Sequence, residues 1–182
     1  MFRSTTILSV RRGGRVVLVG DGQVTMSERV VIKQGACKIR KLHDGRVLCG
    51  FAGAAADGLA LCEVLEGELR SHNGSLLRAA VEMAKAWRTQ RTLQKLEAMM
   101  IAVDDRHTLL ISGTGDVIEP EGGVIAIGSG GHFALSAARA LLTHTQMSAE
   151  EVARASMDIA AQMCVYTNDQ LALESLPSQT ET

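Results

Sequence analysis

Residues 4–22 read STTILSVRRGGRVVLVGDG, and this stretch decides how the rest of the chain is interpreted. Two apolar runs rich in β-branched residues, 6–10 and 16–19, flank a turn that contains two glycines. Such runs joined by a short glycine turn are typical of a β-hairpin. Because Thr5 and Asp21 lie at nearly equal distances along the chain from the Gly13-Gly14 turn, antiparallel pairing should bring them side by side at the open end of the hairpin.

The remaining pattern consists of strands, two helices, more strands and two more helices. Short strands are predicted before the first helix, at 29–32, 37–42 and 46–51, and a second group lies at 98–103, 108–112, 117–118 and 124–127. Apolar residues at helical spacing predict the four helices at 55–71, 75–95, 133–142 and 148–166. Residues after 171 are polar and are expected to form a loose tail.

This order of elements predicts an α/β (α+β) fold built on two antiparallel sheets. The strands at 98–103 and 108–112 are apolar on both faces, so both faces must be covered. Two facing sheets with a helix pair outside each would bury all of them, which is a four-layer αββα sandwich. Strands and helices do not alternate along the chain, which argues against a doubly wound parallel sheet.

Composition points to one globular domain and excludes several classes of protein. The chain has 182 residues, a net charge of −1 and no apolar run near the ~18 residues of a membrane span. No clustered basic track for nucleic acid is present, so these cations are interpreted as solvated strand ends: Arg11, Arg12, Arg15, Lys38, Arg40 and Lys41. There is no secretory signal, and none of the four cysteines forms a CxxC pair, which predicts free thiols in a reducing cytoplasm and no structural zinc.

Thr5 is the first candidate for chemistry. If the chain is cut between Ser4 and Thr5, this residue owns both a hydroxyl and a free α-amine, a nucleophile and a base in one residue. In that case residues 1–4 are a leader removed on maturation, and residues 5–182 form a single domain. The alternative is that two threonines before an apolar alternation are ordinary strand residues.

Two further residues can support a nucleophile at Thr5, and each also has a structural explanation. Lys38 is either an exposed strand lysine or a cation near the hairpin edge. As a cation there, it would lower the pKa of the α-amine from its usual value of about 8. Gly53, between a strand and a helix, is either a packing residue in a turn or a backbone N–H that binds an oxyanion. Asp57 is interpreted as a residue of the helix start.

A Gly-Ser-Gly-Gly loop at 128–131 joins a predicted strand to a predicted helix. No GxxxxGK[ST] motif is present, so nucleotide binding is not predicted for this chain. Ser129 is either a helix N-cap or a polar group near the nucleophile. A Ser129–His132 hydrolase is disfavoured, because the Gly-x-Ser-x-Gly elbow is missing. At the end of the last helix, carbonyl groups near Cys164 and Thr167 offer ligands for a hard cation, although burial alone explains a cysteine there.

Several segments, taken in order, resemble the HslV (ClpQ) family of bacterial peptidases, which are proteasome-β-like N-terminal nucleophile hydrolases. The resemblance extends from Thr5 to about Asn168 and covers nearly the whole chain. It rests on TTILSVRR at 5–12, VGDGQVT at 19–25, GFAG at 50–53, AD at 56–57, AWRT at 86–89, KLEA at 95–98, AIGSGG at 126–131 and YTN at 166–168.

The resemblance implies an αββα sandwich and a threonine endopeptidase. It assigns the roles as follows: Thr5 as nucleophile, Lys38 as the lysine that lowers its pKa, Asp21 as the neighbouring carboxylate, Gly53 as oxyanion donor and Ser129 as a nearby hydroxyl. It also implies a sodium site built from the backbone carbonyls of Ala161, Cys164 and Thr167. The expected assembly is a homo-oligomer of two stacked hexameric rings. An AAA+ unfoldase, HslU, uses ATP to deliver unfolded protein to these rings, and the peptidase itself binds no nucleotide, nucleic acid or membrane.

The chain departs from the family pattern in three places. Ala161 stands where the family usually has glycine, which would cause strain if the backbone there were left-handed. The segment at 26–29 is one residue longer than usual and lies shortly before Lys38. The leader is longer than a lone methionine, so Thr5 is expected to be exposed by self-cleavage at the Ser4–Thr5 bond.

Two other classes of function remain as alternatives. A small-molecule amidase would keep the fold but would need a closed pocket and no unfoldase. An unprocessed, non-catalytic ring subunit would keep its leader, which would leave Thr5 without a free amine. The mass of the intact protein distinguishes this last class from the two enzymes.

Overall fold

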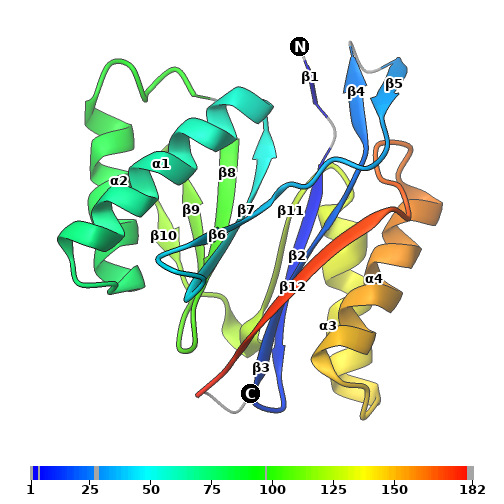
Figure 1. Ribbon diagram of the computed structural model, residues 1–182. Helices are drawn as coiled ribbons and strands as arrows, with labels where there is room; N and C mark the ends of the chain where they lie inside the picture. Colours follow the sequence, from blue (N-terminus) through cyan, green and yellow to red (C-terminus); the bar gives the residue numbers. More distant parts are fainter. Residues whose placement is uncertain (1, 4, 27–28, 97, 180–182) are drawn as a thin grey trace.

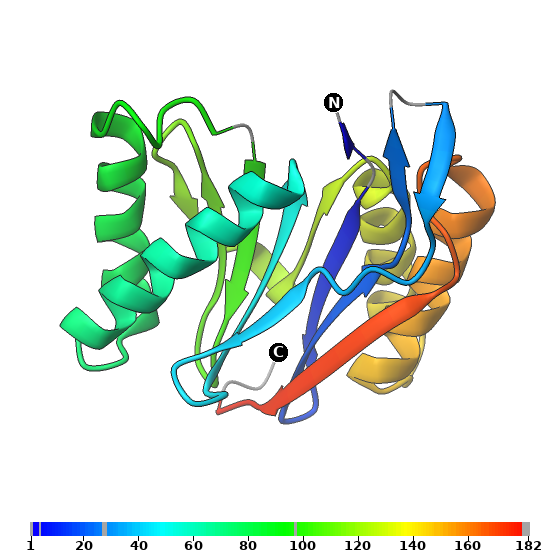
Figure 2. The same cartoon turned by 45° about the horizontal axis from the view of Figure 1, so that its top comes forward.

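The computed structural model describes residues 2–3, 5–26, 29–96 and 98–179, which form four layers. Figure 1 shows two sheets face to face, with α1 and α2 outside one sheet and α3 and α4 outside the other. The turned view in Figure 2 shows the same order of helices, sheet, sheet and helices. The predicted αββα sandwich is therefore confirmed.

The first sheet contains the N-terminal hairpin and is covered by the C-terminal helices. Its strand order is β11-β2-β3-β12, all antiparallel. The elements of this half are β2 (Thr6–Arg12), β3 (Arg15–Asp21), β11 (Val124–Gly128), β12 (Leu171–Pro177), α3 (Gly131–His144) and α4 (Ala149–Met163). The hairpin register pairs Ile7 with Gly20 and Arg12 with Arg15, which confirms the predicted turn.

The second sheet has the order β10-β9-β8-β7-β6 and is also antiparallel. Its half contains β6 (Ile39–Leu42), β7 (Val47–Gly53), β8 (Ala98–Val103), β9 (Thr108–Ser112), β10 (Val117–Ile118), α1 (Ala55–Ser71) and α2 (Leu76–Thr89). A short 3-10 helix, η1 (Glu121–Gly123), precedes β11. A third, small sheet consists of β1 (Phe2–Arg3), β4 (Val24–Met26) and β5 (Val30–Lys33). The strands before α1 are thus shared among three sheets, and the small third sheet is an addition to the two that the sequence predicted.

Buried side chains fill three apolar layers, one between the sheets and one under each helix pair. Strand β2 contributes side chains to two of these layers, because alternate residues of a strand point to opposite faces of the sheet. Ile7 lies between the sheets, and Leu8 packs beneath α3 and α4. A Cβ added at Gly50, in the facing sheet, would lie only 2.9 Å from the Ile7 side chain, so the two sheets are close together here. Within the same sheet, a Cβ added at Gly20, which pairs with Ile7, would lie 2.7 Å from that side chain. These contacts fix the strand that begins directly after Thr5.

The expected loose tail after residue 171 is wrong. Residues 171–177 form β12, which pairs with β3 from Leu171 opposite Asp21 to Pro177 opposite Arg15. Without β12, the backbone groups along the outer side of β3 would form an open sheet edge. The tail is therefore a structural strand that covers β3.

Two helices are shorter than the sequence predicted. Helix α2 ends at Thr89, and residues 90–96 turn so that two leucines pack on the core beneath α1 and α2. Helix α4 ends at Met163, where the chain becomes extended. The carbonyl of Val165 then accepts a hydrogen bond from the side chain of Gln23 at 2.9 Å. In both cases contacts with distant residues replace the last helical turns.

None of the helices in the described ranges has the length and apolarity that crossing a bilayer requires.

The interpretation of Arg11 as a solvated strand end is wrong, because it is only 3% exposed. Its guanidinium donates to the carbonyl oxygens of Asp104 and His107 at 2.9 and 2.7 Å. It also donates to the hydroxyls of Thr108 and Ser178. Burial lowers the pKa of Arg11. This residue ties β2 to the β8–β9 turn and to the segment after β12.

We expect Arg11→Met to lower the free energy of unfolding by about 2–4 kcal/mol, because it removes the buried and part-buried hydrogen bonds that the guanidinium donates. Arg15→Met is the matched control, since Arg15 is exposed and donates only to Ser175 at the surface among the bonds described. The control should change stability by no more than about 0.5 kcal/mol. Urea unfolding of both variants tests this difference, and equal losses would contradict the structural role of Arg11.

Candidate active site

Thr5 lies at the start of β2, beside the turn between β11 and α3. It is 6% exposed, and its carbonyl accepts a hydrogen bond from the N–H of Ser129 at 2.9 Å. A Cβ added at Gly128 would lie 1.8 Å from the Thr5 carbonyl oxygen, and Gly128 has a positive φ of 89°. Only glycine fits this position. The glycine loop at 128–131 therefore holds the backbone of Thr5 in place.

Asp21 and Lys38 form a buried ion pair next to Thr5. Lys38 Nζ donates to Asp21 Oδ1 at 2.9 Å, and the N–H of Thr6 donates to the same oxygen at 2.7 Å. The other oxygen, Asp21 Oδ2, accepts the N–H of Gln23 at 3.0 Å, and Lys38 Nζ also donates to the Gln23 carbonyl at 2.6 Å. The Asp21 carboxylate thus links the lysine ammonium to the residue directly after Thr5. This is the proximity that the hairpin pattern predicted.

Lys38 is 5% exposed, so its interpretation as an exposed strand lysine is wrong. It lies one residue before β6, and its side chain runs inward to the carboxylate of Asp21. Burial lowers the pKa of Lys38, while the charge and hydrogen bond of Asp21 oppose this effect. A lysine ammonium can remain charged in the protein interior when a carboxylate pairs with it. It would lower the pKa of an amine formed at Thr5.

Thr6 is a positioning residue that the sequence did not reveal. Its Oγ1 accepts the N–H of Gly130 at 2.9 Å and lies 2.7 Å from Oγ1 of Thr167. A Cβ added at Gly130 would lie 2.5 Å from Thr6 Oγ1, so the loop must have glycine here as well. Thr6 is fully buried, with 0% exposure. Its hydroxyl joins three chain segments, which leaves Thr5 as the better candidate for a nucleophile.

The segment after α4 closes the same region from another side. Asn168 Oδ1 accepts the N–H of Gly22 at 3.1 Å, and Asn168 Nδ2 donates to the carbonyl of Gln34 at 2.9 Å. A Cβ added at Gly22 would lie 2.2 Å from that same carbonyl oxygen. Asn168 belongs to the YTN motif noted above, and this motif was the only sequence signal for its role. Asn168 holds the turn after Asp21 against the segment that leads to Lys38.

Gly53 and Ser129 lie at the same edge of the sandwich as Thr5. Gly53 ends β7 with a φ of 131°, a conformation that favours glycine. The Cβ added at Gly128, which meets the Thr5 carbonyl, would also lie 3.3 Å from the Ala52 side chain. The end of β7 is therefore close to Thr5. The N-cap of α3 is Gly130, so the N-cap interpretation of Ser129 is wrong.

The structure also locates Asp57 and the proposed cation ligands, which lie outside this cluster. Asp57 lies in the first turn of α1, which confirms its role as a helix-start residue. The residues proposed for a cation, Ala161, Cys164 and Thr167, lie in and just after the last turn of α4. Among described residues other than glycine, positive φ occurs only at His43, Asp44 and Asn73. Alanine at position 161 is therefore free of the backbone strain that a left-handed site would cause.

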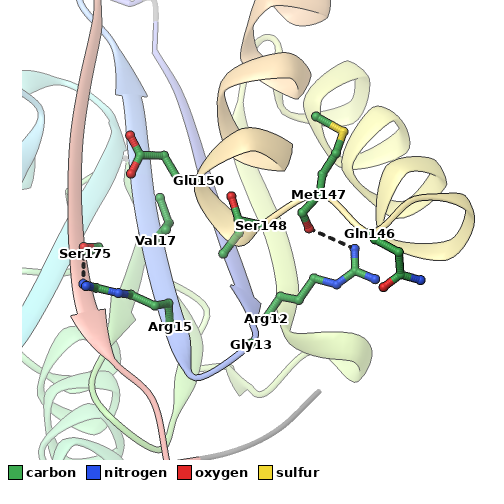
Figure 3. Close-up of a pocket in the computed structure, with 10 residues that line it drawn as sticks. Arg12, Gly13, Arg15, Val17, Gln146, Met147, Ser148, Glu150 and Ser175 are labelled. Carbon is green, nitrogen blue, oxygen red and sulfur yellow. Dashed lines mark hydrogen bonds between the residues drawn. The ribbon is translucent and has the colours of Figure 1, made fainter.

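Three surface pockets in the described part of the chain do not include Thr5 in their lining. One of about 540 Å³ lies between the β2–β3 turn and the start of α4, at the opposite end of the hairpin (Figure 3). Arg12 donates there to the carbonyl of Met147 at 3.2 Å, and Arg15 donates to the hydroxyl of Ser175 at 3.2 Å. Both cations already have partners in the fold. This pocket is therefore separate from the cluster around Thr5.

An αββα sandwich with a threonine at the start of β2, beside a buried lysine–carboxylate pair, defines the proteasome type of N-terminal nucleophile hydrolase. A family model described as "Proteasome subunit" matches residues 1–176 of the chain.

Comparison with individual proteins identifies the family within this class. The ATP-dependent protease subunit HslV of Desulfovibrio desulfuricans is 56% identical over 173 residues, covering 95% of this chain and 98% of its own. The protein of the same name from Rhizorhabdus wittichii is 58% identical over 177 residues, covering 97% and 96%. The crystal structure of eukaryotic HslV from Trypanosoma brucei superimposes with a TM-score of 0.91 at 50% identity, covering 94% and 99%. The chain belongs to the HslV family of proteasome-type peptidase subunits.

Proposed function

We propose that Thr5 becomes the N-terminal residue of the mature peptidase and cleaves peptide bonds of unfolded proteins. The observation that carries this proposal is Asp21 Oδ1, which binds Lys38 Nζ at 2.9 Å and the N–H of Thr6 at 2.7 Å, beside Thr5. The mature domain would comprise residues 5–182, after loss of leader residues 1–4. Ser4 lies outside the described residues, so the cleavage point is argued from Thr5.

In the proposed reaction, Thr5 Oγ attacks the carbonyl carbon of the peptide bond. Its proton passes to the α-amine of Thr5, directly or through water. The Lys38 ammonium lowers the pKa of that amine and so favours its neutral, proton-accepting form. The backbone N–H of Gly53 stabilises the oxyanion, and the hydroxyl of Ser129 assists. The C–N bond then breaks, and the leaving amine takes the proton from the α-ammonium of Thr5. Water, which gives its proton to the same α-amine, hydrolyses the acyl-enzyme and restores Thr5.

The way in which the leader backbone pairs with β4 indicates how a substrate would bind. Strand β1 pairs antiparallel with β4, with Phe2 opposite Met26 and Arg3 opposite Thr25. A substrate added to β4 in the same way would arrive as an extended strand, held by main-chain hydrogen bonds. Such binding depends little on side chains, which suits a peptidase for unfolded proteins. A folded protein cannot present an isolated strand of this kind.

The names of the relatives support a wider assembly, because they describe subunits of an ATP-dependent protease. In the proposed complex, two stacked hexameric rings of this chain enclose the Thr5 sites. The AAA+ unfoldase HslU docks on the ring ends in the cytoplasm and supplies unfolded chains using ATP. In this complex, substrates would be selected by their access to the interior of the rings.

Degradation of casein tests this proposal against the two alternatives. The proposal expects casein to be degraded quickly only when the unfoldase and ATP are both present. A small-molecule amidase would instead hydrolyse small amides at the same rate with and without the unfoldase. A non-catalytic ring subunit would hydrolyse neither substrate and would keep a mass that begins at Met1.

The proposal also includes a sodium ion that binds to the backbone carbonyls of Ala161, Cys164 and Thr167. The last carbonyls of α4 lack helical partners, and oxygen ligands of this kind suit a hard cation. When bound, the ion would hold the segment that carries Thr167, whose hydroxyl contacts Thr6. Replacing sodium by choline should therefore lower the melting temperature, and an unchanged value would contradict the site.

Gly128→Ala should reduce peptidase kcat by roughly 100-fold. The added Cβ would lie 1.8 Å from the carbonyl oxygen of Thr5 and would therefore displace Thr5. Gly115→Ala is the matched control, since Gly115 has a similar φ of 93°. Its added Cβ would meet only the flexible side chain of Arg88, at 3.2 Å, and the edge of the Ala84 carbonyl. Hydrolysis of a fluorogenic peptide compares the two variants. Equal losses of kcat would show that backbone strain, and not the position of Thr5, causes the effect.

A further inference from the structure

Two buried cysteines from different elements lie in contact beneath α1. Cys49 in β7 and Cys62 in α1 are 0% and 5% exposed, and their Sγ atoms are 3.3 Å apart. A disulfide bond has an S–S length of about 2.05 Å, so closure requires an approach of roughly 1.2 Å. We propose that Cys49 and Cys62 are a reversible disulfide site that hydroperoxides oxidise. This site is separate from the Thr5 chemistry.

An oxidant can reach one of these two thiols from the surface. Cys62 lines a surface pocket of about 580 Å³ between α1 and the β6–β7 turn, and Arg40 lines the same pocket. Arg40 is also the residue opposite Cys49 in the pairing of β6 with β7. Cys49 lies behind Cys62 in the apolar layer. A small hydroperoxide would therefore meet Cys62 first.

The surroundings of the two thiols give them different reactivity. The hydrogen bond with Cys49 lowers the pKa of Cys62, and the positive charge of Arg40 adds to this effect, although burial opposes it. The same contact and deeper burial raise the pKa of Cys49. Thiolates are the reactive form of cysteine. Cys62 is therefore the thiol that is attacked by oxidant first, and Cys49 is the partner that resolves the product.

The reaction proceeds in two balanced steps. The Cys62 thiolate attacks the terminal oxygen of the hydroperoxide, and the O–O bond breaks. The alkoxide leaves with the proton that Cys62 has lost, and Cys62 becomes a sulfenic acid. Cys49 Sγ then attacks the Cys62 sulfur, the S–O bond breaks, and hydroxide leaves as water with the proton of Cys49. Two thiols are oxidised to a disulfide, and one hydroperoxide is reduced to an alcohol and water.

The position of the pair gives the bond a structural consequence. The cysteines are 13 positions apart in the sequence, and the loop that they close contains Gly53 and the start of α1. A crosslink over such a loop stabilises the folded chain by restricting the unfolded one. Oxidation would therefore fix α1 to β7 and raise the melting temperature by roughly 5–10 °C.

Mass spectrometry of the full-length protein tests the proposal. No lysine or arginine lies between Arg46 and Arg70, so one tryptic peptide, 47–70, contains both cysteines. After treatment with tert-butyl hydroperoxide, a compact alkyl hydroperoxide, this peptide should lose the mass of two hydrogens and resist alkylation, and dithiothreitol should reverse both changes. The exposed Cys37 serves as an internal measure of the oxidant dose. Two alkylatable thiols in peptide 47–70, at a dose that oxidises Cys37, would overturn the proposal.

Variants separate the pair from cysteine oxidation in general. Cys49→Ser should leave a sulfenic acid on Cys62 that dimedone captures, and it should abolish the rise in melting temperature. Cys37→Ser removes the exposed cysteine, which belongs to neither site, and should leave the disulfide and the temperature rise intact. A crosslink between Cys62 and any other cysteine would also overturn the proposal. If Cys49→Ser does not fold, the mass of peptide 47–70 from the unmodified sequence still decides the question.

Discussion

Thr5→Ala is expected to abolish peptide hydrolysis and to leave the leader attached to the chain. The substitution removes the only hydroxyl that we assign as the nucleophile, so activity should fall by at least about 10⁴-fold. The fold should persist, because the hydrogen bond from Ser129 reaches the backbone carbonyl of residue 5 and not its side chain. Intact mass and hydrolysis of a fluorogenic peptide measure the two effects on the same sample.

Thr5→Ser is the matched control for this experiment, because it keeps a hydroxyl on the same carbon. It should retain both leader removal and measurable hydrolysis, at a reduced rate. If Thr5→Ala lost activity but were processed normally, another residue or another protease would make the cut at Ser4–Thr5. If Thr5→Ala kept full activity, Thr5 would not be the nucleophile.

Lys38→Met is expected to have the second largest effect. Without the ammonium, the pKa of the Thr5 α-amine should rise, so less of it is neutral at a given pH. We expect kcat/KM to fall by roughly 10²–10³-fold, and its acidic limb to move to higher pH by about one unit. The buried Asp21 carboxylate also loses its cation, which should cost about 3–5 kcal/mol of stability.

The pH profile distinguishes an electrostatic role of Lys38 from a purely structural one. Lys41→Met is the control, since Lys41 is exposed and pairs with Glu174 at the surface. It should change neither the profile nor the stability appreciably. In the unmodified protein, burial lowers the pKa of Lys38, so its charge should be lost at a lower pH than that of an exposed lysine. Activity should therefore decline earlier on the alkaline side. An unshifted acidic limb in Lys38→Met would rule out the electrostatic role.

The fold class could be predicted because it depends on the order of elements and on local patterns. The hairpin pattern placed Asp21 beside Thr5 from the turn position and the arm lengths alone, and Thr6 bonds to Asp21 as expected for that register. The apolar strands required cover on both faces, which left few arrangements of the helices. Strand β12 was missed because its pairing with β3 depends on an open sheet edge, and no short window of sequence reveals such an edge.

Much of the candidate site could not be predicted for a similar reason. Lys38 is one of several cations in its segment, and no local pattern distinguishes it from the others. In the fold, the N–H of Ala36 donates to the carbonyl of Gly22, and Lys38 nearby reaches the carboxylate of Asp21. The contact between the hydroxyls of Thr6 and Thr167 joins residues 161 positions apart, which no local pattern can reveal. The resemblance to a family supplied the role of Lys38, while the structure supplied its burial and its partners.

The central claim is that the active protein begins at Thr5, and the mass of the intact purified protein tests it most directly. The proposal predicts that protein able to hydrolyse peptides has lost residues 1–4 and has Thr5 as its N-terminal residue. Active protein whose mass still includes Met1–Ser4 would contradict this claim, because Thr5 would then have no free amine to act as the base.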